Sequence, residues 1–369
     1  NVHYVGVNDR NKHRFEAMWP LPYGVSYNSY LIDDEMVALV DTVDICYFEV
    51  YLRKIKQVIG ERPINYLIIN HMEPDHSGSI RLIKQHYPEI IIVGNKQTFG
   101  MIEGFYGVTG EQYLVKEGDF LALGHHKLRF YMTPMVHWPE TMMTFDETDG
   151  VLFSGDGFGC FGTVDGGFLD TRINVDKYWG EMVRYYSNIV GKYGSPVQKA
   201  LQKLGGLPIS AICSTHGPVW TENIAKVIGI YDRLSRYDAD EGVVIAYGSM
   251  YGNTEQMAEA IAEELSAQGV KNIVMHNVTK SHSSYIIADI FRYKGLIIGS
   301  PTYSNQIFPE VEALLSKILL REVKGRYLGY FGSFTWAGAA VKRLAEFAEK
   351  SKFELVGDPV EMKQAMKDL

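Results

Sequence analysis

The stretch NHMEPDHSGS, residues 70–79, gathers polar side chains directly after an apolar run. It places His71, Glu73, Asp75 and His76 within six positions, and each of these side chains is of a type that binds metal ions. The preceding run, NYLIIN, is rich in β-branched and aromatic residues and predicts a strand. We therefore expect a strand whose end carries a metal site on a loop, supported by a rigid scaffold.

The composition is that of an ordinary globular protein. The chain has 369 residues, 46% of them hydrophobic and 22% charged, which is enough for two domains. A net charge of −8 without a basic stretch argues against a nucleic-acid partner, because phosphate binding depends on clustered lysine and arginine. No apolar run reaches the roughly 18–20 residues of a membrane span, and the first residues show no export signal. Three scattered cysteines form no disulfide framework, so we expect a cytoplasmic protein without a membrane partner.

The first part of the chain mixes strand-like and helical patterns. Short runs such as MVALVDTV, IIIVGN and GVLFSGD are rich in β-branched or aromatic residues and end in turn-forming residues. Helical patterns at residues 44–60 and 176–194 separate some of these runs. This mixture predicts sheets covered by helices, a layered α/β domain, which we assign to residues 1–238.

The pattern becomes regular after residue 238. The strand-like runs VVIAYGS, NIVMHNVT, GLIIGSPTY and YLGYFGSF are each followed by a helical pattern, at a spacing of about 30 residues. Regular alternation of this kind predicts a right-handed, parallel, doubly wound sheet over residues 239–369.

Three further ligand-type residues follow later strand-like runs. They are His137 in PMVHWPETM, Asp156 in LFSGDGFG and His216 in CSTHGPVW. Together with the first cluster they make seven, too many for one tetrahedral zinc ion, so we expect a binuclear site with Asp156 as the bridge. Imidazole and carboxylate ligands suit iron and manganese as well as zinc, so the ligand types alone leave the metal open.

A second motif, GSMYGNTEQMA at residues 248–258, follows a buried strand and opens a helix. Its backbone N–H groups, its hydroxyls and the positive end of the helix dipole suit a phosphate group. It matches neither the ATP-binding GxxxxGK[ST] pattern nor the dinucleotide-binding GxGxxG pattern, and it contains no lysine. Two more loops at strand ends, residues 300–309 and 332–340, place aromatic beside small polar residues, as a flat heterocycle requires.

The motifs HMEPDH, MVHWPETM, LFSGDGFG and PYGVSYNSYLI, together with the phosphate loop, resemble the flavodiiron proteins (A-type flavoproteins) over essentially the whole chain. The resemblance implies a metallo-β-lactamase-like αββα sandwich followed by a flavodoxin-like domain. Two non-haem irons per chain are implied as well, one held by His71, Glu73 and His137 and the other by Asp75, His216 and His76, with Asp156 bridging.

The second implied cofactor is FMN. By this resemblance, the first loop cradles the phosphate and the other two border the isoalloxazine ring, with Tyr303 and Trp336 as the expected ring neighbours. The implied FMN residues are Ser249, Met250, Tyr251, Gly252, Asn253, Thr254, Pro301, Thr302, Tyr303, Ser304, Asn305, Ser333, Phe334, Thr335, Trp336 and Gly338.

The function implied by the resemblance is an oxidoreductase that reduces O₂ to water, NO to N₂O, or both. FMN would relay electrons from a separate donor such as rubredoxin or a reduced deazaflavin. A head-to-tail homodimer, or a dimer of such dimers, would bring the flavin of one subunit to the diiron site of the other. The alternative is a binuclear zinc hydrolase with a flavodoxin-like docking domain, and Glu73 argues against it because zinc hydrolases of this fold usually carry histidine there.

Several residues outside the ligand set are candidates for the wall of the metal pocket. Trp138, Tyr185 and Tyr186 are aromatic candidates, and Cys160 lies four residues after Asp156. His13 is a further candidate, because HRFEAMWP leads into a strand that can reach the pocket.

Overall fold

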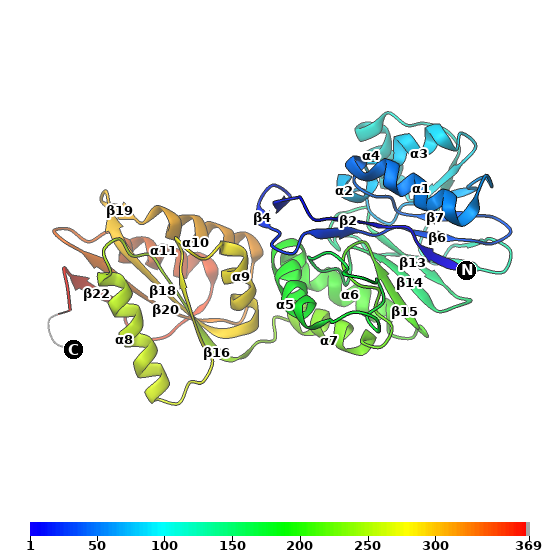
Figure 1. Ribbon diagram of the computed structural model, residues 1–369. Coiled ribbons are helices and arrows are strands. Elements are labelled where there is room, and N and C mark those ends of the chain that lie inside the picture. Colours follow the sequence, from blue (N-terminus) through cyan, green and yellow to red (C-terminus); the bar gives the residue numbers. More distant parts are fainter. Residues whose placement is uncertain (367–369) are drawn as a thin grey trace. The chain divides into compact units, whose positions relative to one another are not determined.

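The computed structural model describes residues 1–366 and divides into two compact units, both visible in Figure 1. The first unit comprises Asn1–Tyr185 and Ser195–Asp232. The second comprises Tyr186–Gly194 and the chain from Arg233 onward. The domain boundary after residue 238 stays a prediction, and the last three residues of that predicted domain lie outside the described residues.

The first unit contains two main sheets. One has the order β1 (Val2–Tyr4), β6 (Tyr30–Ile32), β7 (Ala38–Val40), β8 (Tyr66–Ile68), β9 (Ile91–Gly94) and β10 (Gln112–Leu114). The other has the order β11 (Phe120–Ala122), β12 (Lys127–Met132), β13 (Met142–Asp146), β14 (Val151–Gly155) and β15 (Ala211–Ser214). Small ladders join β2 (Val7–Asp9) to β5 (Val25–Tyr27) and β3 (Arg14–Phe15) to β4 (Trp19–Pro20).

Helices cover the outer faces of the two sheets, which gives the predicted αββα layers (Figure 1). One group consists of α1 (Phe48–Ile59), α2 (Pro74–Ser77), α3 (Ile80–His86) and α4 (Lys96–Tyr106), and the other of α5 (Asp176–Tyr185), α6 (Gly194–Leu204) and α7 (Ile224–Ser235). Helix α1 shows why such helices form, because its apolar residues recur at helical spacing and face the core. Its buried residues are Phe48, Tyr51, Leu52, Ile55 and Ile59.

The core of the first unit lies between its two sheets. Val40 and Ile68 contribute from one sheet, and Phe130 and Phe153 from the other, all of them at most 1% exposed. Because strand side chains alternate between faces, each sheet turns one apolar face to the other sheet and one to its helices. The rigid sandwich fixes the strand ends that carry the predicted ligands.

The second unit is a parallel sheet covered by helices. Its main strands run in the order β17 (Ile273–Asn277), β16 (Asp240–Tyr247), β18 (Tyr293–Tyr303) and β20 (Tyr327–Phe334), with β21 (Glu354–Leu355) and β22 (Val360–Lys363) both pairing with β20. The connecting helices are α8 (Asn253–Ala267), α9 (Ser283–Arg292), α10 (Pro309–Arg321) and α11 (Ala340–Ser351), and a short strand β19 (Gln306–Ile307) folds back on β18. In chain order this is the 2-1-3-4-5 arrangement of the flavodoxin-like fold, so the predicted fold class is confirmed.

The helical pattern at residues 176–194 does not form one continuous helix. The α-helix ends at Tyr185, and a π-helical turn at Tyr186–Val190 and a 3₁₀ turn at Gly191–Tyr193 follow. This short segment packs within the second unit, where the side chain of Asn188 donates a hydrogen bond to the Ser284 carbonyl at 3.0 Å. Tertiary packing therefore overrides the local helical preference. Across residues 1–366, no helix combines the length and hydrophobicity that crossing a membrane requires.

Two glycines of the parallel sheet allow the tightness of its packing to be tested. A Cβ on Gly299 would lie 2.1 Å from the ring of the buried Phe331, whereas a Cβ on Gly329 would meet its nearest neighbour, in Ile297, at an ordinary 3.5 Å. We expect Gly299→Ala to destabilise the second unit by about 1–3 kcal/mol through overpacking. Gly329→Ala is the matched control and should change stability little. Urea unfolding followed by circular dichroism measures both, and equal stability of the two variants would contradict this account.

Candidate metal and flavin sites

All seven predicted metal ligands lie where strands of the first unit end. His71 and Glu73 follow β8, and Asp75 and His76 lie in the short helix α2 that comes next. His137 lies between β12 and β13, Asp156 follows β14, and His216 follows β15. None of the seven is more than 9% exposed, so the structure brings all of them into one buried region.

Asp156 lies between two groups of ligands. Its Oδ2 atom is 3.0 Å from Nε2 of His137 and 3.6 Å from Nε2 of His71. Its Oδ1 atom is 3.1 Å from Nε2 of His76 and 3.5 Å from Nε2 of His216. Each carboxylate oxygen therefore faces a different pair of histidines, which is the arrangement of a bridging ligand.

The ligand atoms of each group lie close enough to share one ion. Those of His71, Glu73, His137 and Asp156 lie within 4.8 Å of one another, and so do those of Asp75, His76 and His216. His76 points into its group rather than away from it. The geometry thus offers two adjacent metal positions, as the sequence predicts.

The polar atoms of the second group support binding of a cation. Both carboxylate oxygens of Asp75, both ring nitrogens of His76 and Nε2 of His216 are buried and make no hydrogen bond of ordinary geometry among residues 1–366, although Nε2 of His216 lies 3.2 Å from Oδ2 of Asp75. Leaving buried polar atoms unpaired costs free energy, and a bound metal ion would satisfy them. The donor set therefore fits a metal centre.

The pKa shifts in the first group also support binding of a cation. Burial by itself would lower the pKa of His137, but hydrogen bonds to Asp156 and Glu73 raise it to about 10. Burial would also lower the pKa of His71, but its hydrogen bonds to Glu140 and Glu73 raise that pKa to about 9. Without an ion, these carboxylates therefore hold protons on the imidazoles. A metal ion competes with those protons for the same atoms.

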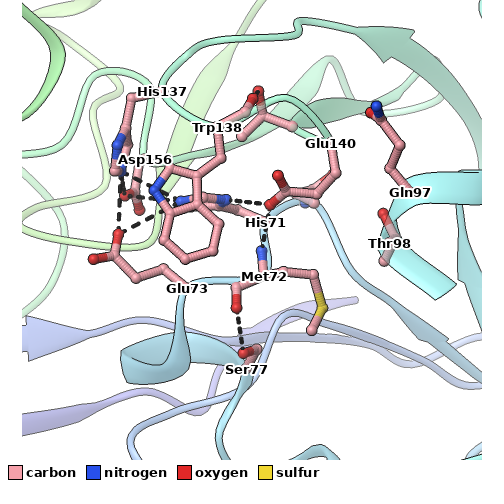
Figure 2. Close-up of polar contacts among 12 residues, drawn as sticks. His71, Met72, Glu73, Ser77, Gln97, Thr98, His137, Trp138, Glu140 and Asp156 are labelled. Atoms are coloured by element: carbon pink, nitrogen blue, oxygen red, sulfur yellow. Dashed lines mark hydrogen bonds and ion pairs between the residues drawn. The ribbon is translucent and has the colours of Figure 1, made fainter. Parts of the chain in front are cut away.

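Two ligands are oriented by hydrogen bonds on the far side of their rings. Nδ1 of His216 donates to the Ser26 carbonyl at 2.8 Å, and Nδ1 of His71 donates to Glu140 at 2.7 Å (Figure 2). Each bond fixes the tautomer and turns Nε2 towards the centre. Glu140 is not among the predicted site residues, although it lies three residues after His137 in the sequence HWPE.

Aromatic rings surround the ligands. The Trp138 ring centroid is 5.2 Å from that of His71, and the Tyr185 and Phe15 centroids are 5.8 Å and 5.3 Å from that of His216. Tyr186, by contrast, packs against Phe291 in the second unit. Tyr185 and Trp138 are thus the pocket candidates that contact metal-ligand rings.

A cavity of about 610 Å³ leads to two of the ligands, Glu73 and Asp75. Its wall includes Phe15 and Glu16, which come from the HRFEAMWP segment, whereas His13 of that segment is exposed and is not part of the wall. The segment therefore reaches the site as predicted, but through Phe15 and Glu16 instead of His13. Cys160 is buried and lies against Gly217, the residue after His216.

The three predicted flavin loops converge at the carboxyl edge of the parallel sheet in the second unit. The hydroxyls of Thr254, in the first loop, and Ser333, in the third, lie 2.9 Å apart. The hydroxyl of Thr302, in the second loop, accepts the N–H of Ala339 at 3.0 Å. The three loops therefore form one site, as the switch point of a doubly wound sheet predicts.

The first loop has the features of a phosphate site. Gly252, the residue that caps the start of helix α8, has a left-handed φ of 93°, and its N–H donates to the Ser249 hydroxyl at 3.1 Å. The first N–H groups of a helix have no partner within the helix and therefore bind anions. The two predicted ring neighbours, Tyr303 and Trp336, are 47% and 81% exposed, which leaves both rings accessible to a planar ligand.

Known proteins match both units. A family profile described as "ODP family beta lactamase" covers residues 25–217, and one described as "Flavodoxin" covers residues 245–368. An anaerobic nitric oxide reductase flavorubredoxin from Vibrio vulnificus is 32% identical over 360 residues, covering 96% of this chain and 73% of that protein.

Solved structures agree over nearly the whole chain. The rubredoxin oxygen:oxidoreductase from Desulfovibrio gigas has a TM-score of 0.95 and 31% identity, covering 99% of this chain and 92% of that one. The flavodiiron protein from Giardia intestinalis has a TM-score of 0.95 and 28% identity, covering 99% and 90% respectively.

The fold and the two sites define an oxidoreductase that joins a metallo-β-lactamase-like domain to a flavodoxin-like domain. The chain belongs to the flavodiiron protein family. The cofactors of this family are FMN and a non-haem diiron centre. The flavodoxin domain and the clustered metal-binding side chains of this chain agree with both.

Gly252 provides a test of the phosphate loop. A Cβ on Gly252 meets nothing within 4 Å, so Gly252→Ala costs only the strain of a positive φ, about 1–3 kcal/mol. Gly269, beyond the other end of α8, has the same φ of 93° and equally open space. We expect both alanine variants to lose similar stability, but only Gly252→Ala to bind FMN more weakly, because its strain distorts the loop. Fluorescence titration of the FMN-free proteins measures this, and equal FMN affinities would contradict the assignment.

Proposed function

We propose that this protein reduces O₂ to water, NO to N₂O, or both, at a diiron centre held by Asp156 and the six predicted ligands around it. FMN in the flavodoxin domain would pass on electrons from a separate donor protein or a reduced deazaflavin. The observation that carries the proposal is the position of Asp156, whose two oxygens face two separate histidine pairs. When bound, two adjacent redox-active metals and a flavin supply the several electrons that these reductions need.

The residues of the chain have distinct roles in this proposal. Glu73, Asp75 and Asp156 provide three carboxylates that offset the charge of the metal ions, and the four histidines complete two adjacent positions. Trp138, Tyr185 and Phe15 surround the imidazoles and restrict water at the site. The Tyr185 hydroxyl is buried without a hydrogen-bond partner among the described residues, so it is available to a small polar ligand.

The names of related proteins are consistent with both NO and O₂ as substrates. One relative is named as a nitric oxide reductase and another as an oxygen:oxidoreductase, and both names include rubredoxin. A rubredoxin-type donor is therefore part of the proposal. A binuclear zinc hydrolase is the competing function, and the same cluster of imidazoles and carboxylates suits that metal too.

One experiment separates the two functions. The purified protein is analysed for iron, zinc and FMN, reduced without oxygen, and then given a pulse of O₂ or of NO. We expect two irons and one FMN per chain and rapid consumption of at least one gas. Two zinc ions per chain and no gas consumption would overturn the proposal in favour of the hydrolase.

Glu73 tests the ligand assignment directly. Because Glu73 lies 3.1 Å from Nε2 of His137 within the first group, Glu73→Ala should lower the iron content and abolish gas reduction. The FMN content should not change, because FMN binds to the other domain. Glu103→Ala, which removes an exposed carboxylate from α4, is the matched control and should behave like the unaltered protein. Normal turnover by Glu73→Ala would show that the assignment is wrong.

We further propose a head-to-tail homodimer, in which the flavin of one subunit serves the diiron site of the other. The cavity beside Glu73 and Asp75 has Ile45 and Phe105 in its wall, exposed by 55% and 52%. Large exposed apolar side chains around an opening are typical of a surface that a partner covers. Gas reduction should therefore fall as the protein is diluted below the dissociation constant of the dimer, measured by analytical ultracentrifugation. Full activity in a monomeric preparation would contradict the arrangement.

A further inference from the structure

Glu140 is a buried acidic residue behind the His71 ring, and it is not one of the seven predicted metal ligands. It is 0% exposed, and its Oε1 atom accepts two hydrogen bonds, from Nδ1 of His71 at 2.7 Å and from the N–H of Met72 at 2.8 Å. Figure 2 shows the Glu140 carboxylate on the side of the His71 ring that faces away from Glu73. Its other oxygen, Oε2, has no hydrogen-bond partner within residues 1–366.

These two bonds determine which nitrogen of His71 faces the centre. An ionised carboxylate can only accept hydrogen bonds, so Nδ1 of His71 is the donor to Glu140, and Nε2 is the nitrogen that a metal ion can bind once it displaces any proton there. Nε2 lies 3.5 Å from Glu73 and 3.6 Å from Asp156. The second bond, to Met72, anchors the same carboxylate to the backbone that joins His71 to Glu73. Glu140 thereby fixes both the tautomer and the position of His71.

The loop that carries Glu140 is itself held in place. The side chain of Asn95 donates to the Glu140 carbonyl at 2.6 Å, and the carbonyl oxygen of that side chain caps helix α4 by accepting the N–H groups of Gln97 and Thr98. A continuous path of hydrogen bonds therefore leads from the start of α4 through Glu140 to His71. Such support restricts the movement of a ligand before any metal binds.

Glu140 also makes the two metal positions unequal. In the second group, Nδ1 of His216 donates to the neutral carbonyl of Ser26, and Nδ1 of His76 has no hydrogen-bond partner in the described part of the chain. In the first group, the His71 ring is backed by a full negative charge. A carboxylate behind a metal-bound imidazole increases the basicity of the ligand, which favours the more highly charged oxidised metal.

We propose that Glu140 is a positioning residue that holds His71 for the metal position shared with Glu73 and His137. It strengthens metal binding there and makes that metal harder to reduce than its neighbour. This inference rests on the proposed ligand set, and it adds a residue that touches neither metal nor substrate.

Two substitutions separate the charge of Glu140 from its hydrogen bonds. Glu140→Gln keeps an oxygen that accepts from His71 and Met72 but removes the charge, so the iron should stay bound while the midpoint potential of one iron becomes more positive. Glu140→Leu removes both, so one of the two irons should bind about 10- to 100-fold more weakly. Iron retention against a chelator and a potentiometric titration followed by EPR measure these effects without relying on turnover.

The matched control is Asp146→Asn. His126 and Asp146 form a similar buried pair in the same domain, with Nδ1 to Oδ2 at 2.8 Å, but the pair lies outside the seven-residue cluster. Its disruption should leave the iron content and both potentials unchanged, even if the thermal midpoint falls. FMN content and circular dichroism show whether each variant has folded, and Glu140→Gln provides the test if Glu140→Leu does not fold.

The outcomes are distinct. Iron-free wild-type protein would contradict the proposed function itself. If the wild-type protein binds iron and both Glu140 variants match its potentials and iron retention, the proposed role of Glu140 is wrong. The proposed function would not be affected by that result. Equal loss of both irons in Glu140→Leu, with unchanged potentials in Glu140→Gln, would also overturn it, because Glu140 would then be only structural.

Discussion

The structure of the first unit depends on the burial of mutually interacting charges around Asp156. Three carboxylates and four imidazoles lie together with at most 9% exposure. Such a group is stable only when its charges are neutralised and its polar atoms are paired, since burial of an isolated charge costs many kcal/mol. Protons on the imidazoles can balance the carboxylates in part, and metal ions can do so while also satisfying the unpaired atoms of Asp75, His76 and His216.

The two packed sheets make this arrangement possible. Strands β8, β14 and β15 end at one side of the sandwich, and the loops that follow them carry His71, Asp156 and His216. Because the strands are held by the core on their inner faces, their ends are fixed relative to one another. The second unit applies the same principle to a different ligand, since the three predicted flavin loops converge at one edge of its parallel sheet.

Much of this was predictable, because the relevant signals are local. The fold class follows from the alternation of apolar runs and helical patterns, and it is confirmed. The helix predicted at residues 44–60 appears as a 3₁₀ turn at Ile45–Tyr47 followed by α1. The segment at residues 176–194 was harder, because the packing of Tyr186–Gly194 within the second unit breaks a pattern that locally favours a helix.

The residue types and the spacing of apolar residues are properties of the sequence alone. They were sufficient to predict the fold class, the ligand-type residues and the phosphate loop. Only the tertiary structure decided which of these side chains meet and how they are oriented. Glu140 is 69 positions from His71 along the chain, yet their side chains lie 2.7 Å apart. Likewise, Phe15 rather than His13 reaches the site from the HRFEAMWP segment. Hydrogen-bond partners and ring orientations depend on distances between strand ends, and those distances are set by packing between sheets, which no local pattern encodes.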